Sequence, residues 1–178
     1  QKVVISQMVL MMTACIILIL VIARYFRWLY LPILLALCVT IITPDFMEYE
    51  TRILTEPLFC TLLLLWFAAL IAFLFKPKTT IASLVGVLIA LIIITRPAGL
   101  FLLPIFCLVI ARTYLTTYNK AITASLVLST TLTLTGYATY NAFTLGEFEI
   151  TSESGRNICY ATASLVSPSP EYSEEMNT

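Results

Sequence analysis

The sequence contains no histidine and little charge, since Asp, Glu, Lys and Arg together make up 11% of its 178 residues. Soluble domains carry about 25% charged residues. With 60% hydrophobic residues and a mean hydropathy of +0.98, the composition excludes an ordinary soluble domain. The absence of histidine also removes the most common metal ligand and the usual proton shuttle near neutral pH. We therefore expect an all-α integral membrane protein.

Several motifs of soluble proteins are also missing. No GxGxxG or P-loop pattern is present to hold a nucleotide. The basic residues are dispersed and form no nucleic-acid-binding patch. The five cysteines form no CxxC pair, and four of them lie in apolar runs, where a thiol behaves as a small hydrophobic group. These patterns therefore indicate no particular cofactor, and the first expected partner is the lipid bilayer.

Six apolar runs approach the roughly 20 residues that a membrane-spanning helix needs. Three of the runs are short, and we expect these to be tilted, partly buried in protein or extended by flanking aromatic residues. Pro104 lies at the middle of the fifth run, so a re-entrant segment is an alternative there. The expected spans are Val3–Ala23, Trp28–Ile42, Pro57–Phe75, Thr80–Thr95, Pro97–Ala111 and Ala121–Phe143.

The charges between these runs sort by sign. If the first span runs inward, every acidic residue falls on one side, and the other side carries only basic residues, namely Arg24, Arg27, Lys76, Lys78, Arg112 and Lys120. Cytoplasmic loops are enriched in Lys and Arg, so the basic side is predicted to be cytoplasmic. Residues 144–178, which follow a transmembrane domain over residues 1–143, then form an outward-facing polar segment, the start of a loop or soluble domain.

Charge is concentrated in one outer stretch, TPDFMEYETRILTEPLF, at residues 43–59. Asp45, Glu48, Arg52 and Glu56 follow one another at steps of three, four and four, a spacing that places them on one face of a helix. We expect a short amphipathic helix at the outer membrane interface. A simpler explanation is that the i,i+4 pairs only support a surface helix, each contributing about 0.2–0.5 kcal/mol.

Two charged residues lie at the mouths of predicted spans. Glu56 opens an almost entirely apolar run, and Arg96 precedes Pro97 in the sequence ITRPAGL. A carboxylate in this position can line an outward-facing cavity, while an arginine beside a helix start can bind a phosphate through its bidentate fork and the helix dipole. The plainer alternatives are an interfacial anchor for Glu56 and an arginine that extends to lipid head groups for Arg96.

Three short motifs resemble those of the GT-C superfamily of multispanning glycosyltransferases, in particular protein O-mannosyltransferases and the aminoarabinose transferases of lipid A. In order, they are TEPLF at Thr55–Phe59, RPAGL at Arg96–Leu100 and GRNI at Gly155–Ile158. The resemblance extends over about residues 28–163. It implies an enzyme that transfers a sugar from a polyprenyl- or dolichyl-phosphate carrier to an acceptor on the outer face, although neither the sugar nor the acceptor can be named.

The resemblance also implies roles for individual residues. Glu56 would be a catalytic carboxylate of the active cavity; its expected partner, from the i,i+4 spacing and not from the resemblance, is Arg52. Arg96 would bind the carrier phosphate, and Asn157 would lie near the donor or acceptor. Some members of the superfamily use a divalent metal, so a metal is possible here too. This sequence, however, has no dedicated set of metal ligands.

The sequence departs from the family in one respect. The principal catalytic acid of the family usually lies in the first outer loop, ahead of the matched region, and no such loop is present here. We therefore expect a piece of a longer polypeptide that is inactive alone. A secondary transporter and a non-catalytic membrane scaffold are the alternative functions. A bacterial inner or plasma membrane is favoured over the endoplasmic reticulum, since no N-x-S/T site supports a glycosylated lumenal loop.

Overall fold

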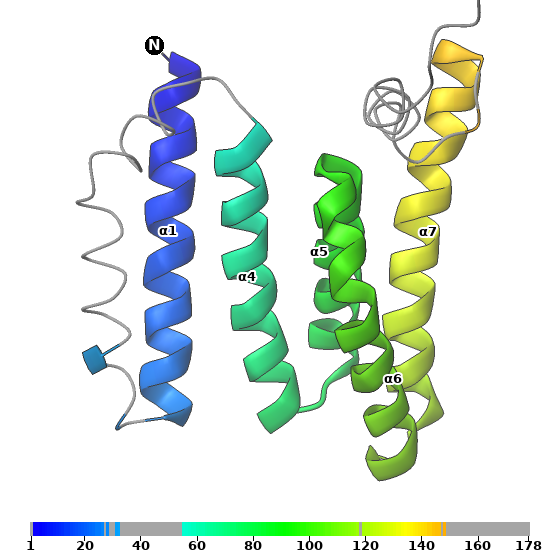
Figure 1. The fold of residues 1–178 in the computed structure, drawn as a ribbon. Coiled ribbons are helices and arrows are strands. Elements are labelled where there is room, and N and C mark those ends of the chain that lie inside the picture. Colours follow the sequence, from blue (N-terminus) through cyan, green and yellow to red (C-terminus); the bar gives the residue numbers. More distant parts are fainter. Residues whose placement is uncertain are drawn as a thin grey trace, which may run out of the picture.

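The computed structural model describes residues 2–26, 55–117 and 119–146, together with residues 28, 31, 32 and 148. Every regular element in these residues is a helix (Figure 1). The helices are α1 (Lys2–Tyr25), α4 (Thr55–Phe75), α5 (Thr79–Thr95), the 3-10 helix η1 (Pro97–Leu102), α6 (Leu103–Thr117) and α7 (Lys120–Leu145). The predicted all-α class is confirmed for this part of the chain.

Four helical stretches are long and apolar enough to cross a membrane, namely Ile5–Tyr25, Glu56–Phe75, Pro97–Thr116 and Lys120–Thr144. They correspond to the first, third, fifth and sixth predicted spans. The fourth predicted span is the shorter apolar helix α5, of 17 residues. The second predicted span and the outer amphipathic helix lie almost entirely outside the described residues. What is described is compatible with a multi-pass membrane protein.

The fifth span is longer than its apolar run. Pro104 is the second residue of α6, where the missing proline N–H removes no helical hydrogen bond. η1 and α6 therefore follow each other as one helical run that is long enough to span a membrane. α6 also continues past Ala111 to Thr117. The side chain of Arg112 is exposed, and a long arginine side chain can reach the interface from within the last turns of a helix.

α5 lies at the centre of the described bundle. It packs against α4 and against α7, while α1 packs on α4 (Figure 1). Ile89 and Ile92 of α5 join Trp66 and Phe73 of α4 in the main hydrophobic core. A helix enclosed by protein does not have to match the full thickness of the bilayer, so the short α5 is consistent with its place in the bundle.

The contact between α5 and α7 is polar as well as close. The hydroxyl groups of Ser83 and Ser125 are 2.6 Å apart and share a hydrogen bond. Thr130 Oγ1 donates to the carbonyl oxygen of Gly86 at 3.1 Å. Small and hydroxyl-bearing residues are typical of helix contacts in membranes, because they let two backbones approach each other closely.

The two ends of the bundle differ in chemistry. α4 begins and α5 ends at the same end, which carries Glu56 and Arg96 and is called the Glu56 end (Figure 1). The opposite end, called the basic end, contains the α4–α5 and α6–α7 connections, and at or near it lie Arg24, Lys76, Lys78, Arg112 and Lys120. Among the described basic residues, Lys2, the first residue of α1, and Arg96 lie at the Glu56 end.

We predict that these ends face opposite sides of the membrane. In a variant lacking the native cysteines, Pro77→Cys should react with an impermeant maleimide only from the cytoplasmic side, and Ala98→Cys only from outside. Both positions are exposed, and neither substitution changes the charges that orient the protein. Labelling of both cysteines from the same side would contradict the proposed orientation.

Candidate functional site

Glu56 and Arg96, which belong to different sequence motifs, form an ion pair at the Glu56 end. Arg96 Nη2 lies 3.0 Å from Glu56 Oε1. The side chains of Arg96 and Glu56 are 43% and 34% exposed, so part of the pair lies open at this end of the bundle. Glu56 is the only acidic residue among those the structure describes, and it is therefore the only carboxylate counterion for Arg96 in that part of the chain.

The pairing follows from the lengths of two neighbouring helices. The connection Lys76–Lys78 joins α4 and α5, which run antiparallel and side by side (Figure 1). α4 has 21 residues and α5 has 17, and a helix rises about 1.5 Å per residue. Glu56 is the second residue of α4, and Arg96 directly follows α5. The two residues therefore reach a similar height above the connection.

The RPAGL motif holds Arg96 at the end of α5. The backbone of Arg96 is extended, with φ −154° and ψ 130°, and its N–H donates to the carbonyl oxygen of Ile92 at 3.0 Å. Pro97 then begins η1, and the N–H of Gly99 donates to the Arg96 carbonyl oxygen at 2.9 Å. A Cβ on residue 99 would lie 2.8–3.0 Å from atoms of Ile92. Glycine thus allows η1 to fold closely onto the end of α5.

The second carboxylate oxygen of Glu56 is not used by the ion pair. Oε2 is buried and has no hydrogen-bond partner among the described residues. Leaving a buried polar atom without a partner is costly, so a hydroxyl group or cation that reached Oε2 would be bound favourably. The guanidinium group of Arg96 has five N–H donors, more than the carboxylate can accept. The pair therefore presents a hydrogen-bond acceptor and a cationic donor side by side.

The other predicted site residues lie outside the described part of the chain. These are Arg52 and Asn157, together with the surface charges Asp45 and Glu48. Within the described ranges, no group of three or more His, Cys, Asp or Glu side chains is placed to hold a metal ion. Glu56 and Arg96 are thus the two predicted site residues whose geometry is known, and they are in contact.

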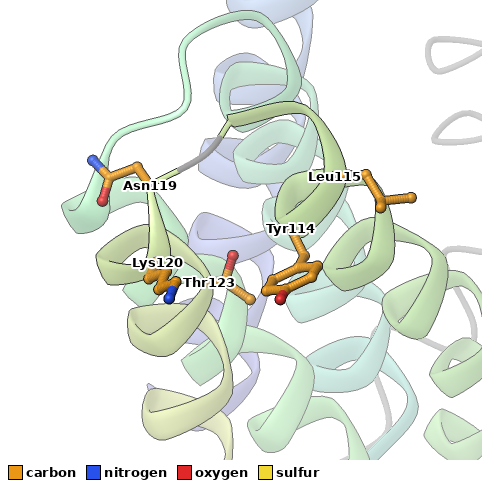
Figure 2. A pocket seen from close by; sticks show the side chains of 5 residues that line it. All are labelled: Tyr114, Leu115, Asn119, Lys120 and Thr123. Atoms are coloured by element: carbon orange, nitrogen blue, oxygen red, sulfur yellow. The ribbon is translucent and has the colours of Figure 1, made fainter.

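A second polar feature was missed by the sequence patterns. It is a cavity between α6 and α7 at the basic end, lined by Tyr114, Leu115, Asn119, Lys120 and Thr123 (Figure 2). In the sequence, Lys120 indicates only the orientation of the chain in the membrane. The available signal was the cluster of Tyr114, Asn119 and Lys120 within one short connection, but this does not reveal a cavity without the packing of the two helices.

Comparison with protein-family models, curated proteins and solved structures gave no match for this chain. The likeness to GT-C glycosyltransferases therefore depends on the three short motifs alone, and a functional proposal depends on the geometry of the Glu56–Arg96 pair.

Proposed function

We propose that this chain acts in a membrane glycosyltransferase, which moves a sugar from a polyprenyl- or dolichyl-phosphate carrier to an acceptor on the outer face. The observation that carries the proposal is the 3.0 Å contact between Glu56 and Arg96, since it joins the TEPLF and RPAGL motifs that suggested the family. Six membrane spans, an outer interfacial helix and an outward-facing segment over residues 144–178 belong to the same proposal. So does location in a bacterial inner or plasma membrane.

The pair supplies two groups that an inverting sugar transfer needs. In this reaction the bond between the sugar and the carrier phosphate breaks, and the acceptor hydroxyl oxygen bonds to the same sugar carbon. Glu56 takes the proton of the acceptor hydroxyl on its carboxylate group, as a general base. Arg96 stabilises the negative charge that develops on the departing carrier phosphate. The products are the glycosylated acceptor and the free lipid phosphate.

Arg96 supplies this positive charge mainly through its side chain. It directly precedes η1, which runs on into α6, so the positive end of this helical run adds to the charge of the guanidinium group. A guanidinium group can bind a phosphate and a carboxylate at the same time, because its planar fork presents donors along more than one edge. Arg96 therefore can hold the carrier phosphate while it stays paired with Glu56.

Arg96→Gln is expected to raise the KM for the lipid-linked sugar about 10- to 100-fold, because a hydrogen bond to a charged group typically contributes about 1.5–3 kcal/mol. The measurement is the dependence of sugar transfer on donor concentration, in membranes that contain the protein expressed from its complete coding sequence. Lys78→Gln removes the same charge at the basic end and should leave KM unchanged. A KM for Arg96→Gln equal to that of the wild type would refute the phosphate-binding role.

The same ion pair is also consistent with one other function, that of a non-catalytic membrane subunit in which the pair only joins α4 to the end of α5. The weakness of that alternative is its small benefit, because a partly exposed ion pair contributes only about 0–1 kcal/mol to stability. A secondary transporter would instead use charges or broken helices near the middle of the membrane. In the described residues, the charges lie at or near helix ends.

A further inference from the structure

We propose that the cavity between α6 and α7 at the basic end binds the phosphate group of an anionic phospholipid. The cavity has a volume of about 240 Å³ and is lined by Tyr114, Leu115, Asn119, Lys120 and Thr123 (Figure 2). It lies at the opposite end of the bundle from Glu56 and Arg96. The proposal therefore concerns a different ligand and stands independently of the sugar transfer proposed above.

Lys120 supplies the positive charge of this site. It is the first residue of α7, its side chain is exposed, and it lines the cavity. Glu56, the single acidic residue of the described ranges, lies at the other end of the bundle, so no described carboxylate neutralises the ammonium group. Further basic residues share this end, which makes its field attractive to anions.

Thr123 supplies a hydrogen-bond donor that the helix itself does not use. Other threonines of α7, such as Thr131 and Thr135, donate to the carbonyl oxygen four residues earlier. For Thr123 that carbonyl belongs to Asn119, and Thr123 makes no such bond. Thr123 Oγ1 is buried with no hydrogen-bond partner among the described residues. A phosphate oxygen is an acceptor that would satisfy it.

The geometry of the lining residues brings these groups together. Thr123 follows Lys120 by three residues, so the two lie on one face of α7. In Figure 2, Thr123 lies between Lys120 and the ring of Tyr114, which comes from α6. The side chain of Asn119 has a separate role, because its Oδ1 accepts the N–H of Ala121 at 3.1 Å and caps α7. The ammonium group, and not the start of the helix, is thus the main anion-binding element.

The apolar part of the lining favours a lipid over a soluble phosphate. Leu115 and Tyr114 are 71% and 63% exposed, and both lie near the end of the candidate span Pro97–Thr116. In a membrane, an exposed leucine at this position contacts acyl chains, while a tyrosine lies at the level of the head groups. Basic pockets between spanning helices on the cytoplasmic side are typical sites for anionic lipid head groups.

The test is lipid binding to the detergent-solubilised protein, with dioleoyl phosphatidic acid as the probe and native mass spectrometry as the readout. Lys120→Gln is expected to weaken binding about tenfold, and Thr123→Val, which keeps the shape but removes the hydroxyl group, about threefold to tenfold. Lys120→Arg should bind like the wild type. Lys78→Gln is the matched control and should change binding less than about twofold, because Lys78 does not line the cavity.

Three results would overturn the proposal. Equal weakening by Lys120→Gln and Lys78→Gln would show that only the general positive field of this end attracts the lipid. If Thr123→Val bound the lipid as tightly as the wild type, the Thr123 hydroxyl group would have no part in lipid binding. Displacement of the lipid by glycerol 3-phosphate at an equal concentration would assign the cavity to a soluble phosphate ester. Should Lys120→Gln fail to fold, the first comparison is made with Lys120→Met, and the Thr123→Val comparison is unaffected.

Discussion

Gly86→Ala is expected to lower the free energy of unfolding by about 1–3 kcal/mol, the usual cost of overpacking. A Cβ on residue 86 would lie 2.6 Å from the carbonyl oxygen of Leu126 and 2.8 Å from Thr130 Oγ1, and it would also collide with Ser129 Oγ. The Ser129 side chain can rotate away, but the Leu126 carbonyl belongs to the backbone of α7. Relief therefore requires α5 and α7 to separate, which breaks the hydrogen bond from Thr130 to Gly86.

Gly136→Ala is the matched control, because it makes the same substitution within α7. Nothing lies within 4 Å of a Cβ at residue 136, and replacing a helical glycine by alanine stabilises a helix by about 0.5–1 kcal/mol. The two variants should therefore shift stability in opposite directions. Unfolding by SDS can be followed by tryptophan fluorescence, since Trp66 is 0% exposed in the core while the other tryptophan, Trp28, is already exposed in the folded protein. Equal shifts for the two variants would contradict the close α5–α7 contact.

Glu56→Gln is expected to reduce the rate of sugar transfer by about 10²–10⁴-fold, the usual contribution of a general base. Glutamine has the same shape as glutamate and can accept a hydrogen bond from Arg96, but its amide cannot take a proton from the acceptor. The free energy of unfolding should change by less than about 1 kcal/mol, because the ion pair is partly exposed. No Lys or Arg changes, so the orientation in the membrane should be unaffected.

The rate is measured at saturating lipid-linked donor, with the protein expressed from its complete coding sequence. The amount of folded protein is determined in parallel, so that a loss of protein is not mistaken for a loss of catalysis. Lys78→Gln, at the basic end, again serves as the control that changes one charge. A Glu56→Gln protein that transfers sugar at the wild-type rate would exclude Glu56 as the base.

The bounds of a helix could be predicted where its apolar run ends at a residue that also ends the helix, such as one that precedes a proline. The run Thr80–Thr95 differs from α5 by a single residue, and Pro97 marks the start of η1. The end of α6 was missed because the charge of Arg112 interrupts the apolar run without interrupting the helix. Hydropathy detects the loss of apolar character, whereas a helix continues as long as its backbone hydrogen bonds are satisfied.

The candidate site could be predicted only in part. Counting spans places Glu56 and Arg96 on the same side, but their contact depends on which helices are neighbours. The short connection Lys76–Lys78 carries some of that information, since it makes α4 and α5 antiparallel neighbours. The roles of Gly86 and Thr123 could not be predicted, because each depends on which atoms of a neighbouring helix or turn lie close to it. For Gly86, the decisive atom is the carbonyl oxygen of Leu126 on α7.

The most direct test of the account is the rate of sugar transfer by the exchange variant that combines Glu56→Arg with Arg96→Glu. This protein keeps an ion pair between the start of α4 and the end of α5, but the base and the phosphate-binding group have changed places. We predict that its free energy of unfolding stays within about 1 kcal/mol of the wild-type value, while transfer is as slow as in Glu56→Gln. Recovery of wild-type transfer would contradict the account, because the pair would then serve only to join the two helices.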